Sequence, residues 1–402
     1  MRRIAALLSL VATLVSCQSA PRTGSDGGTP APKKVVIGLS LDTVREERWQ
    51  RDRDEFVRHA ESLGAEVRVQ VANNDHTRQV AQCENLLTQG VDVLVVAPHD
   101  SESAATIVKA AHDAHVPVIA YDRLIKNSDV DLYLSFDNVQ VGRLQAQYAV
   151  QRVPKGRYLL IAGAPTDHNA HLFRQGQMEV LQPFVDRGDI AIVADPWAND
   201  WQPVEALKIM ENALTRTGNR IEVVVASNDG LAGGAVQAIA EQRLTGKVLV
   251  TGQDAELAAC QRILSGTQSM TVYKSIPRLA RRGAEAAIAL ARREPLTDAT
   301  ATLDNGFKAV PSLLIPPVAV DAANLDSTVV AEGFHTREAI MAGVKTPRCA
   351  PPWARRASSW SGSRRTSAAC ARSTACRSNC VRARFMRSAA RTARASPPCS
   401  RC

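Results

Sequence analysis

Short apolar runs alternate with amphipathic helical patterns from Val35 to about Ile276, at roughly 25–30 residues for each pair. The runs contain few polar residues, which is typical of strands in a parallel sheet with both faces covered. One helical pattern places Trp49 and Phe56 on the same stripe, and Gly64 can end that helix. The alternation predicts a doubly wound α/β architecture. The expected strands are Val35–Leu41, Val91–Ala97, Val118–Tyr121, Tyr158–Ala162, Ile190–Asp195, Ile221–Ala226 and Val248–Thr251.

About ten such pairs would overload a single sheet, so the chain of 402 residues is expected to form two Rossmann-like lobes. No clean linker separates them, which indicates a hinge of three chain crossings. We expect the crossings near Asp137–Asn138, Ser275–Pro277 and Lys308–Ser312. The N-terminal lobe would then comprise residues 35–137 and 277–310, and the C-terminal lobe residues 138–276 and 311–345.

The N-terminus has the pattern of an export signal. Two arginines precede the apolar run 4–15, which is too short to span a bilayer but suits a signal peptide. The run ends at Cys17 in a sequence that resembles a bacterial lipobox, so residues 1–17 are expected to be a lipoprotein signal peptide with Cys17 lipidated. The alternative is ordinary cleavage beside an incidental cysteine. Residues 18–34 are rich in Gly, Ser, Thr and Pro and predict a flexible tether to the membrane. An exported location argues against a cytoplasmic repressor.

Residues 346–402 are mostly Arg, Ala, Ser, Cys and Pro without an apolar period, which predicts a disordered basic tail. Two explanations remain open: a frameshift product, which six unpaired cysteines favour, or a real tail that binds an acidic surface. Thirteen of the 49 basic residues and none of the 40 acidic ones follow Pro347, which leaves 36 basic against 40 acidic. The net charge of +9 therefore does not predict binding of nucleic acid by the folded part.

Polar and aromatic side chains follow strand after strand at the point where each strand ends. Because open α/β sheets bind ligands beyond the carboxyl ends of their strands, we expect these side chains to meet. Carboxylates, amides and guanidinium groups suit the hydroxyls of a sugar, and flat aromatic rings suit its faces. Taken singly, an Asp after a strand is an ordinary helix cap and a Trp is ordinary packing. Together they predict a monosaccharide site formed by Arg48, Trp49, Arg123, Asp167, Asn169, Trp201, Asn228, Asp254 and Lys274.

Other chemistries have weaker support in the sequence. The Gly-rich run at 230–234 is not a dinucleotide fingerprint, and its glycines are expected to permit close helix–sheet packing. His168 and His171 lack the spacing of metal ligands, so no metal or cofactor is expected. Asp167 and Asp254 would serve a glycosidase only if one had a raised pKa, and the flanking cations favour two ionised carboxylates. We therefore expect a binding protein and not an enzyme.

Long sequence blocks carry a resemblance to a known family. The chain resembles the periplasmic D-xylose-binding proteins, of the type I sugar-binding superfamily that serves ABC transporters, from about Val35 to His335. The resemblance implies two lobes with sugar in the cleft and sugar contacts at the candidate residues above. His168 departs from it, because many relatives carry Asn there. The blocks are 47–54, 120–123, 135–138, 172–178, 207–215, 225–229, 252–255 and 270–274.

The expected protein is an exported, lipid-anchored monomer that captures an aldopentose, foremost D-xylose, and delivers it to an ABC transporter permease. Two alternatives stay open. The same site would serve a sugar sensor that presents its bound form to a membrane kinase. The second alternative is a sugar-processing enzyme, which tests of product formation would reveal.

Overall fold

The computed structural model describes residues 34–344. The expected signal peptide, its lipidation site Cys17, nearly all of the tether and the basic tail lie outside the described residues. Within the part of the chain that the structure describes, no helix combines the length and apolar character that crossing a bilayer requires.

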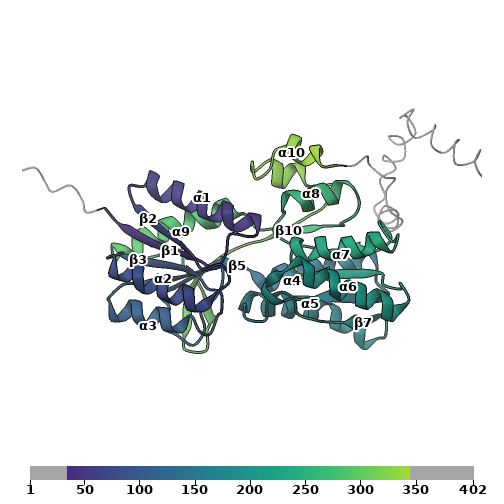
Figure 1. Cartoon of the computed structure of the whole chain (residues 1–402), viewed down its shortest axis with the longest axis horizontal. Helices are drawn as coiled ribbons and strands as arrows, with labels where there is room; N and C mark the ends of the chain where they lie inside the picture. The colour runs from purple at the N-terminus through teal and green to yellow at the C-terminus, as the bar shows by residue number, and fades with distance from the viewer. Residues whose placement is uncertain (1–33, 345–402) are drawn as a thin grey trace, which may run out of the picture. The chain divides into compact units, whose positions relative to one another are not determined.

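The first lobe is built on a seven-stranded sheet with the order β11-β12-β5-β4-β3-β1-β2 (Figure 1). Its strands are parallel except for the antiparallel pair β11–β12 at one edge. The central strands are buried along their whole length, because helices cover both faces of the sheet. The strands are β1 (Val36–Leu41), β2 (Glu66–Val71), β3 (Val93–Ala97), β4 (Val118–Tyr121), β5 (Leu132–Phe136), β11 (Ala301–Asp304) and β12 (Ala309–Ile315).

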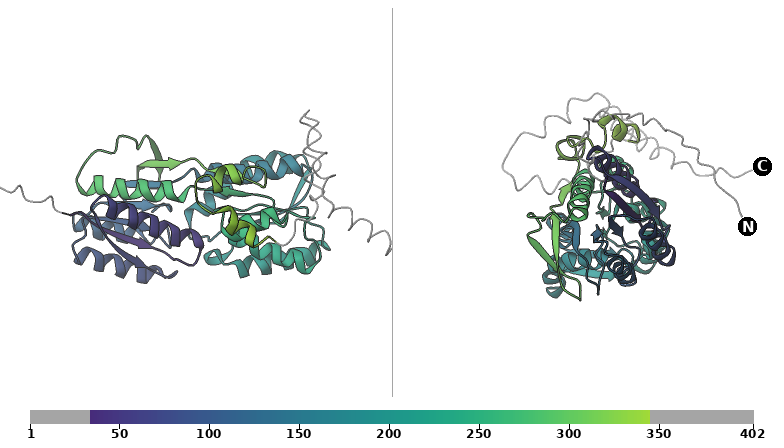
Figure 2. Two further views of the ribbon diagram at one scale, coloured as in Figure 1. Left: turned by 90° about the horizontal axis from the view of Figure 1, so that it is seen from above. Right: turned by 90° about the vertical axis from the view of Figure 1, so that its left-hand side faces the viewer.

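Four helices cover this sheet, two on each face. Helices α1 (Glu47–Ser62) and α9 (Ile276–Ala291) lie side by side on one face (Figure 2, left), where Phe56 packs with Leu279. Helices α2 (His76–Thr88) and α3 (Ala105–Asp113) cover the other face. The sheet therefore has a separate apolar core on each side, which explains its unbroken apolar strands.

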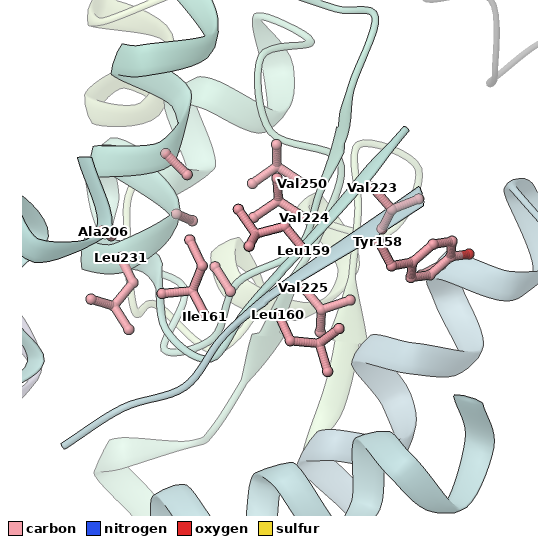
Figure 3. Close-up of a cluster of buried hydrophobic side chains, with 14 of the residues drawn as sticks. Tyr158, Leu159, Leu160, Ile161, Ala206, Val223, Val224, Val225, Leu231 and Val250 are labelled. Atoms are coloured by element: carbon pink, nitrogen blue, oxygen red, sulfur yellow. The ribbon is translucent and has the colours of Figure 1, made fainter. Parts of the chain in front are cut away.

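The second lobe is built on a parallel four-stranded sheet with the order β7-β6-β8-β9. Helix α4 packs against α5, and α6 packs against α7. The crossovers from β6 to β7 and from β7 to β8 run in opposite directions, so right-handed connections place α5 and α6 on opposite faces. The apolar side chains of the sheet and its helices form a single large core, part of which Figure 3 shows. The elements are α4 (Asn138–Arg152), β6 (Gly156–Ile161), α5 (His168–Asp186), β7 (Ile190–Ala194), α6 (Pro203–Thr217), β8 (Val223–Ala226), α7 (Asp229–Glu241) and β9 (Leu249–Val250).

Close helix pairs in the second lobe depend on glycine. A Cβ on Gly142 would lie 2.0 Å from the carbonyl oxygen of Phe173, and one on Gly176 would lie 1.9 Å from that of Val139. A Cβ on Gly234 would lie 2.1 Å from the carbonyl of Pro203 in α6. The glycines of the 230–234 run were expected to serve helix–sheet packing, and Gly234 instead permits close packing of two helices.

The chain passes between the two lobes after β5, before α9 and after β12. The last crossing differs from the expected one near Lys308–Ser312, because β12 remains paired with β5 as far as Ile315. The expected lobe boundary at residues 310 and 311 is therefore wrong: it would cut β12 in two. Beyond it, β13 (Val318–Val320) pairs with β10 (Thr271–Tyr273) in a small antiparallel sheet.

The last described part of the chain returns to the second lobe. A π-helical turn, η2 (Asp326–Val330), precedes α10 (Arg337–Ala342), which packs against α8 (Leu257–Leu264) (Figure 1). Tyr273, Phe334 and Ile340 are buried together in the core beneath them. The predicted fold class, two doubly wound α/β lobes joined by three crossings, is confirmed.

Candidate ligand-binding site

One cavity of about 30 Å³ lies between the two lobes, at the carboxyl ends of their strands. This volume holds about one or two water molecules, so a sugar ring fits only when the lining side chains or the two lobes move apart. All nine residues that the sequence nominated line it: Arg48, Trp49, Arg123, Asp167, Asn169, Trp201, Asn228, Asp254 and Lys274. Glu46, Asp122, Phe173 and Gln253 complete the lining.

Helix starts position several of these side chains. Arg48 and Trp49 lie in the first turn of α1. Asp167 caps α5 by accepting the amide of Asn169 at 2.9 Å, and Asn228 caps α7 by accepting the amide of Leu231 at 2.8 Å. Asp167 and Asn228 therefore act as helix caps and also line the cavity.

Three lining residues have left-handed backbone conformations. The φ angles are 61° for Asp122, 56° for Trp201 and 94° for Asp254. Such conformations are uncommon for residues other than glycine and are often held in place at functional sites. Asp122 and Asp254 lie in loops after strands, and Trp201 ends the short 3₁₀-helical turn η1 (Asn199–Trp201) that follows β7.

Arg48 is the centre of a buried ionic cluster. It contacts Asp52 at 2.8 Å, Asp122 at 2.9 Å and, across the lobes, Asp254 at 3.8 Å. Burial would raise the pKa of Asp122, but Arg48 and Lys274 outweigh it and hold that pKa below its ordinary value. Burial does raise the pKa of Asp52 to about 6, against the opposing effect of Arg48. Asp52 also accepts a hydrogen bond from Tyr121 Oη at 2.7 Å.

Arg123 joins the lobes through a second set of ion pairs. It lies 2.7 Å from Asp42 in the first lobe and 2.8 Å from Asp167 in the second. Burial would raise the pKa of Asp42, but its hydrogen bond with His99 and the charge of Arg123 lower it overall. For Asp167, burial outweighs Arg123 and raises the pKa. The direction of this shift is opposite to the one that the neighbouring cation alone would cause.

Aromatic rings form part of the lining from both lobes. The Trp49 ring packs against the guanidinium groups of Arg48 and Arg123, at 4.2 and 5.2 Å from its centroid. In the second lobe, Trp201 makes an edge contact with Phe173, with centroids 6.2 Å apart. The Trp201 ring also lies against Gly163, where a Cβ would come within 2.0 Å of Cη2. Only glycine at 163 leaves room for the indole in this position.

Three buried oxygens of the lining lack a hydrogen-bond donor among the described residues. The buried oxygens Glu46 Oε2, Gln253 Oε1 and Asp254 Oδ1 receive no hydrogen bond from the described residues. Lys274 Nζ lies 3.1 Å from Asp254 Oδ1, as an ion pair whose angles do not suit a hydrogen bond. Buried acceptors of this kind carry an energetic cost that a hydroxyl donor in the cavity would relieve.

Asn169 has a different role from its lining neighbours. Its Nδ2 donates to Asp122, at 3.0 Å to the backbone oxygen and 3.2 Å to the carboxylate. Its Oδ1 accepts from Asn138 at 2.9 Å and from Tyr133 at 3.3 Å. The amide is therefore engaged with the protein on both atoms, and in this structure it links Asp122 to the second lobe.

Sequence reasoning missed four lining residues. Asp122 and Gln253 follow the same strands as the nominated Arg123 and Asp254, so their place at the strand ends was the available signal. Phe173 follows Asn169 by four residues and so shares its face of α5. Glu46 immediately precedes α1 and gave no distinguishing signal.

His168 does not line this cavity. It lines a separate pocket with Ser101, Lys126 and His171, among others, and its backbone amide donates to Ser101 Oγ at 3.0 Å. Burial, helped by Lys126 and His171, lowers the pKa of its imidazole to about 4. His168 therefore contacts the first lobe without reaching the lining.

The fold and the cavity define a class of protein: two α/β lobes with a polar cavity where the strand ends of both meet. A family model described as "Periplasmic binding protein domain" matches residues 37–295. The chain belongs to this periplasmic binding protein family.

Named relatives agree with this assignment. The chain is 49% identical to the D-xylose-binding periplasmic protein of Haemophilus influenzae, over 83% of this chain and 98% of that one. It is 52% identical to the protein of the same name from Escherichia coli, over 75% and 92%. A solved carbohydrate transporter solute binding protein from Chloroflexus aurantiacus, in complex with D-glucose, has a TM-score of 0.73 and 32% identity, covering 76% of this chain and 98% of that chain.

Proposed function

We propose that this protein captures one aldopentose, foremost D-xylose, and delivers it to the permease of an ABC transporter. The observation that carries the proposal is the lining of the cavity, where fork-shaped ionic groups and indole rings from both lobes meet around one small space. Two relatives at about half identity bear the name D-xylose-binding periplasmic protein, which supports the choice of sugar.

The proposed binding mode follows from the lining chemistry. Ring hydroxyls donate to the oxygens of Gln253 and Asp254 that accept no hydrogen bond within the protein, and accept from Arg48, Lys274 and the amide of Asn228. Trp49 and Trp201 cover the two faces of the sugar ring. No step in this function makes or breaks a bond, so the protein needs no cofactor and is not an enzyme.

The sugar would also hold the lobes together. Because its partners come from both lobes, the ligand binds the closed arrangement better than an open one and so shifts the population towards closure. The closed form is the one that docks on the permease. The chain works as a monomer. It is exported and anchored through a lipid on Cys17, as its N-terminal sequence predicts.

A melting-temperature screen against pentoses and hexoses tests the proposal. A ligand at about 100 times its Kd stabilises the folded state by about 2.7 kcal/mol, which corresponds to a rise of a few degrees. We expect D-xylose to give the largest rise and the Asp254→Ala variant to give a rise of about half or less at the same concentration. The absence of any shift with every sugar, in protein that melts cooperatively, would refute the function.

A further inference from the structure

A second cluster links the lobes behind Asp254 and includes His335, a residue of the last described segment. His335 is buried, with 4% of the residue's surface exposed. Its Nε2 lies 2.8 Å from the carbonyl oxygen of Ala255, next to Asp254. Its Nδ1 lies 3.2 Å from Nη2 of Arg51 in α1, and Arg51 Nη1 donates to the carbonyl of Phe334 at 2.8 Å.

The two partners fix the protonation state of this imidazole. A carbonyl only accepts hydrogen bonds and a guanidinium only donates them, so Nε2 must carry the proton and Nδ1 must be bare. A second proton on Nδ1 would face Arg51. Burial and the charge of Arg51 lower the pKa of His335, although Ala255 and the Glu47 carboxylate, 3.9 Å from Nδ1, act in the opposite direction.

The carbonyl that His335 holds belongs to a strained turn. Asp254 and Ala255 are both left-handed, with φ angles of 94° and 51°. The turn is tied down on one side by hydrogen bonds from its amides to Val272 O and Thr271 Oγ1, at 2.9 and 3.1 Å. His335 supplies the donor to the Ala255 carbonyl, and Asp254 projects into the cavity beside Lys274.

The same cluster reaches α1, whose first turn carries Arg48 and Trp49. Glu47 Oε1 accepts from Arg51 Nε at 2.9 Å, and Glu47 Oε2 accepts the amide of Leu257 at 3.0 Å. Glu47 in the first lobe thus caps the start of α8 in the second, where the cap residue Glu256 makes no side-chain cap of its own. The cluster joins the lobes directly behind the cavity wall.

We propose that His335 is a positioning residue for the sugar site: its neutral imidazole holds the Asp254–Ala255 turn and ties it to α1 through Arg51. This inference rests on the proposed function, because it concerns the affinity of the same cavity. The neutral form is the one that fits the joined lobes. Binding should therefore release a proton from His335 in acidic solution and weaken as the pH falls below the ordinary histidine value of about 6.5.

Calorimetric titration with D-xylose between about pH 5 and pH 8 tests the proposal on three substitutions. His335→Ala removes the donor to Ala255 and should weaken binding about tenfold at neutral pH. His335→Gln places an amide donor near the position of Nε2, so it should recover most of the affinity and lose the acidic weakening. His335→Asn reaches only the Nδ1 position and should behave like the alanine variant.

Two further variants distinguish a specific effect on binding from a general folding defect. Arg51→Met removes the cation that opposes protonation in the joined lobes, so the weakening of binding in acid should become smaller while neutral-pH affinity changes less. His76→Ala, at an exposed helix start, should match the wild type at every pH. Melting temperatures of the sugar-free proteins show which variants fold.

The outcomes separate the two proposals. Wild-type protein that binds no sugar at any pH refutes the proposed function itself. Wild-type protein that binds sugar, with folded His335→Ala and Arg51→Met showing the same affinity and pH profile, overturns only the role of His335. An affinity loss in His335→Ala that His335→Gln restores, together with a smaller acidic weakening of binding in Arg51→Met, supports it.

Discussion

The indole of Trp201 donates a hydrogen bond from Nε1 to Oδ2 of Asp167, at 3.2 Å. The same oxygen lies 2.8 Å from Arg123 of the other lobe. The cap of α5 therefore fixes the orientation of an aromatic ring and an ionic contact between the lobes at once. A substitution at Trp201, Asp167 or Arg123 should therefore change the position of the other two side chains.

Gly163→Ala tests the position of Trp201. The added Cβ would lie 2.0 Å from Cη2, so the indole must move and its bond to Asp167 must lengthen or break. We expect D-xylose binding to weaken about tenfold or more, since a misplacement that costs 1.4 kcal/mol has that effect. Titration measures the affinity, and Trp fluorescence reports the displaced ring. Unchanged affinity would show that Trp201 does not contact the ligand.

Asp254→Ala tests the ionic side of the cavity. It removes a buried acceptor beside Lys274 and should weaken binding by about 10- to 150-fold, the equivalent of a charge-assisted hydrogen bond of about 1.5–3 kcal/mol. Asp113→Ala is the matched control, because this carboxylate is exposed and only pairs with Lys109 in α3. Wild-type affinity in Asp254→Ala would contradict the assigned role.

Asp52→Asn tests the electrostatics behind Arg48. The pKa of Asp52 is raised from 3.8 to about 6, so the folded protein holds this proton more tightly than the unfolded chain. The protonated Asp52 carboxyl adds its full contribution to the unfolding free energy below pH 3.8, and this contribution is lost as the pH rises through 6. Relative to the variant, the wild type should lose about 2 kcal/mol of unfolding free energy between about pH 4.5 and pH 7.5.

Urea unfolding of both proteins across this range measures the difference. Because the asparagine cannot ionise, the unfolding free energies of the two proteins should diverge with pH. Parallel pH profiles would show that Asp52 does not titrate in this window.

Gly176→Ala tests the close packing of α4 against α5. Its Cβ would lie 1.9 Å from the backbone oxygen of Val139, which cannot move without shifting the helix. We expect a loss of about 1–3 kcal/mol in unfolding free energy, as for other overpacked sites. Gly230→Ala is the control, because its Cβ would meet nothing closer than 3.5 Å. Equal stability of the two variants would contradict the packing account.

The sequence predicted the strand ends well because unbroken apolar runs are a strong local pattern. It therefore found Arg123 and Asp254, which follow such runs. It did not anticipate that Asn169 would be engaged with Asp122, since this contact depends on how the two lobes meet. The crossing after Ile315 was misplaced because only pairing with β5 shows where β12 ends.

The direction of the pKa shift of Asp167 was not available from the sequence. Arg123 alone would lower this pKa, but the balance depends on how completely the folded protein removes water from the carboxylate. Similarly, Glu46 and Phe173 carry no pattern that separates a lining residue from any other helix residue. Their place at the cavity is a property of the assembled fold.

The most direct test of the central claim is a calorimetric titration of the purified protein with D-xylose. One sugar should bind per chain with a Kd in the micromolar range or tighter, and Asp254→Ala should lose at least about tenfold. No heat of binding with D-xylose or any other pentose or hexose, from folded protein, would contradict the account.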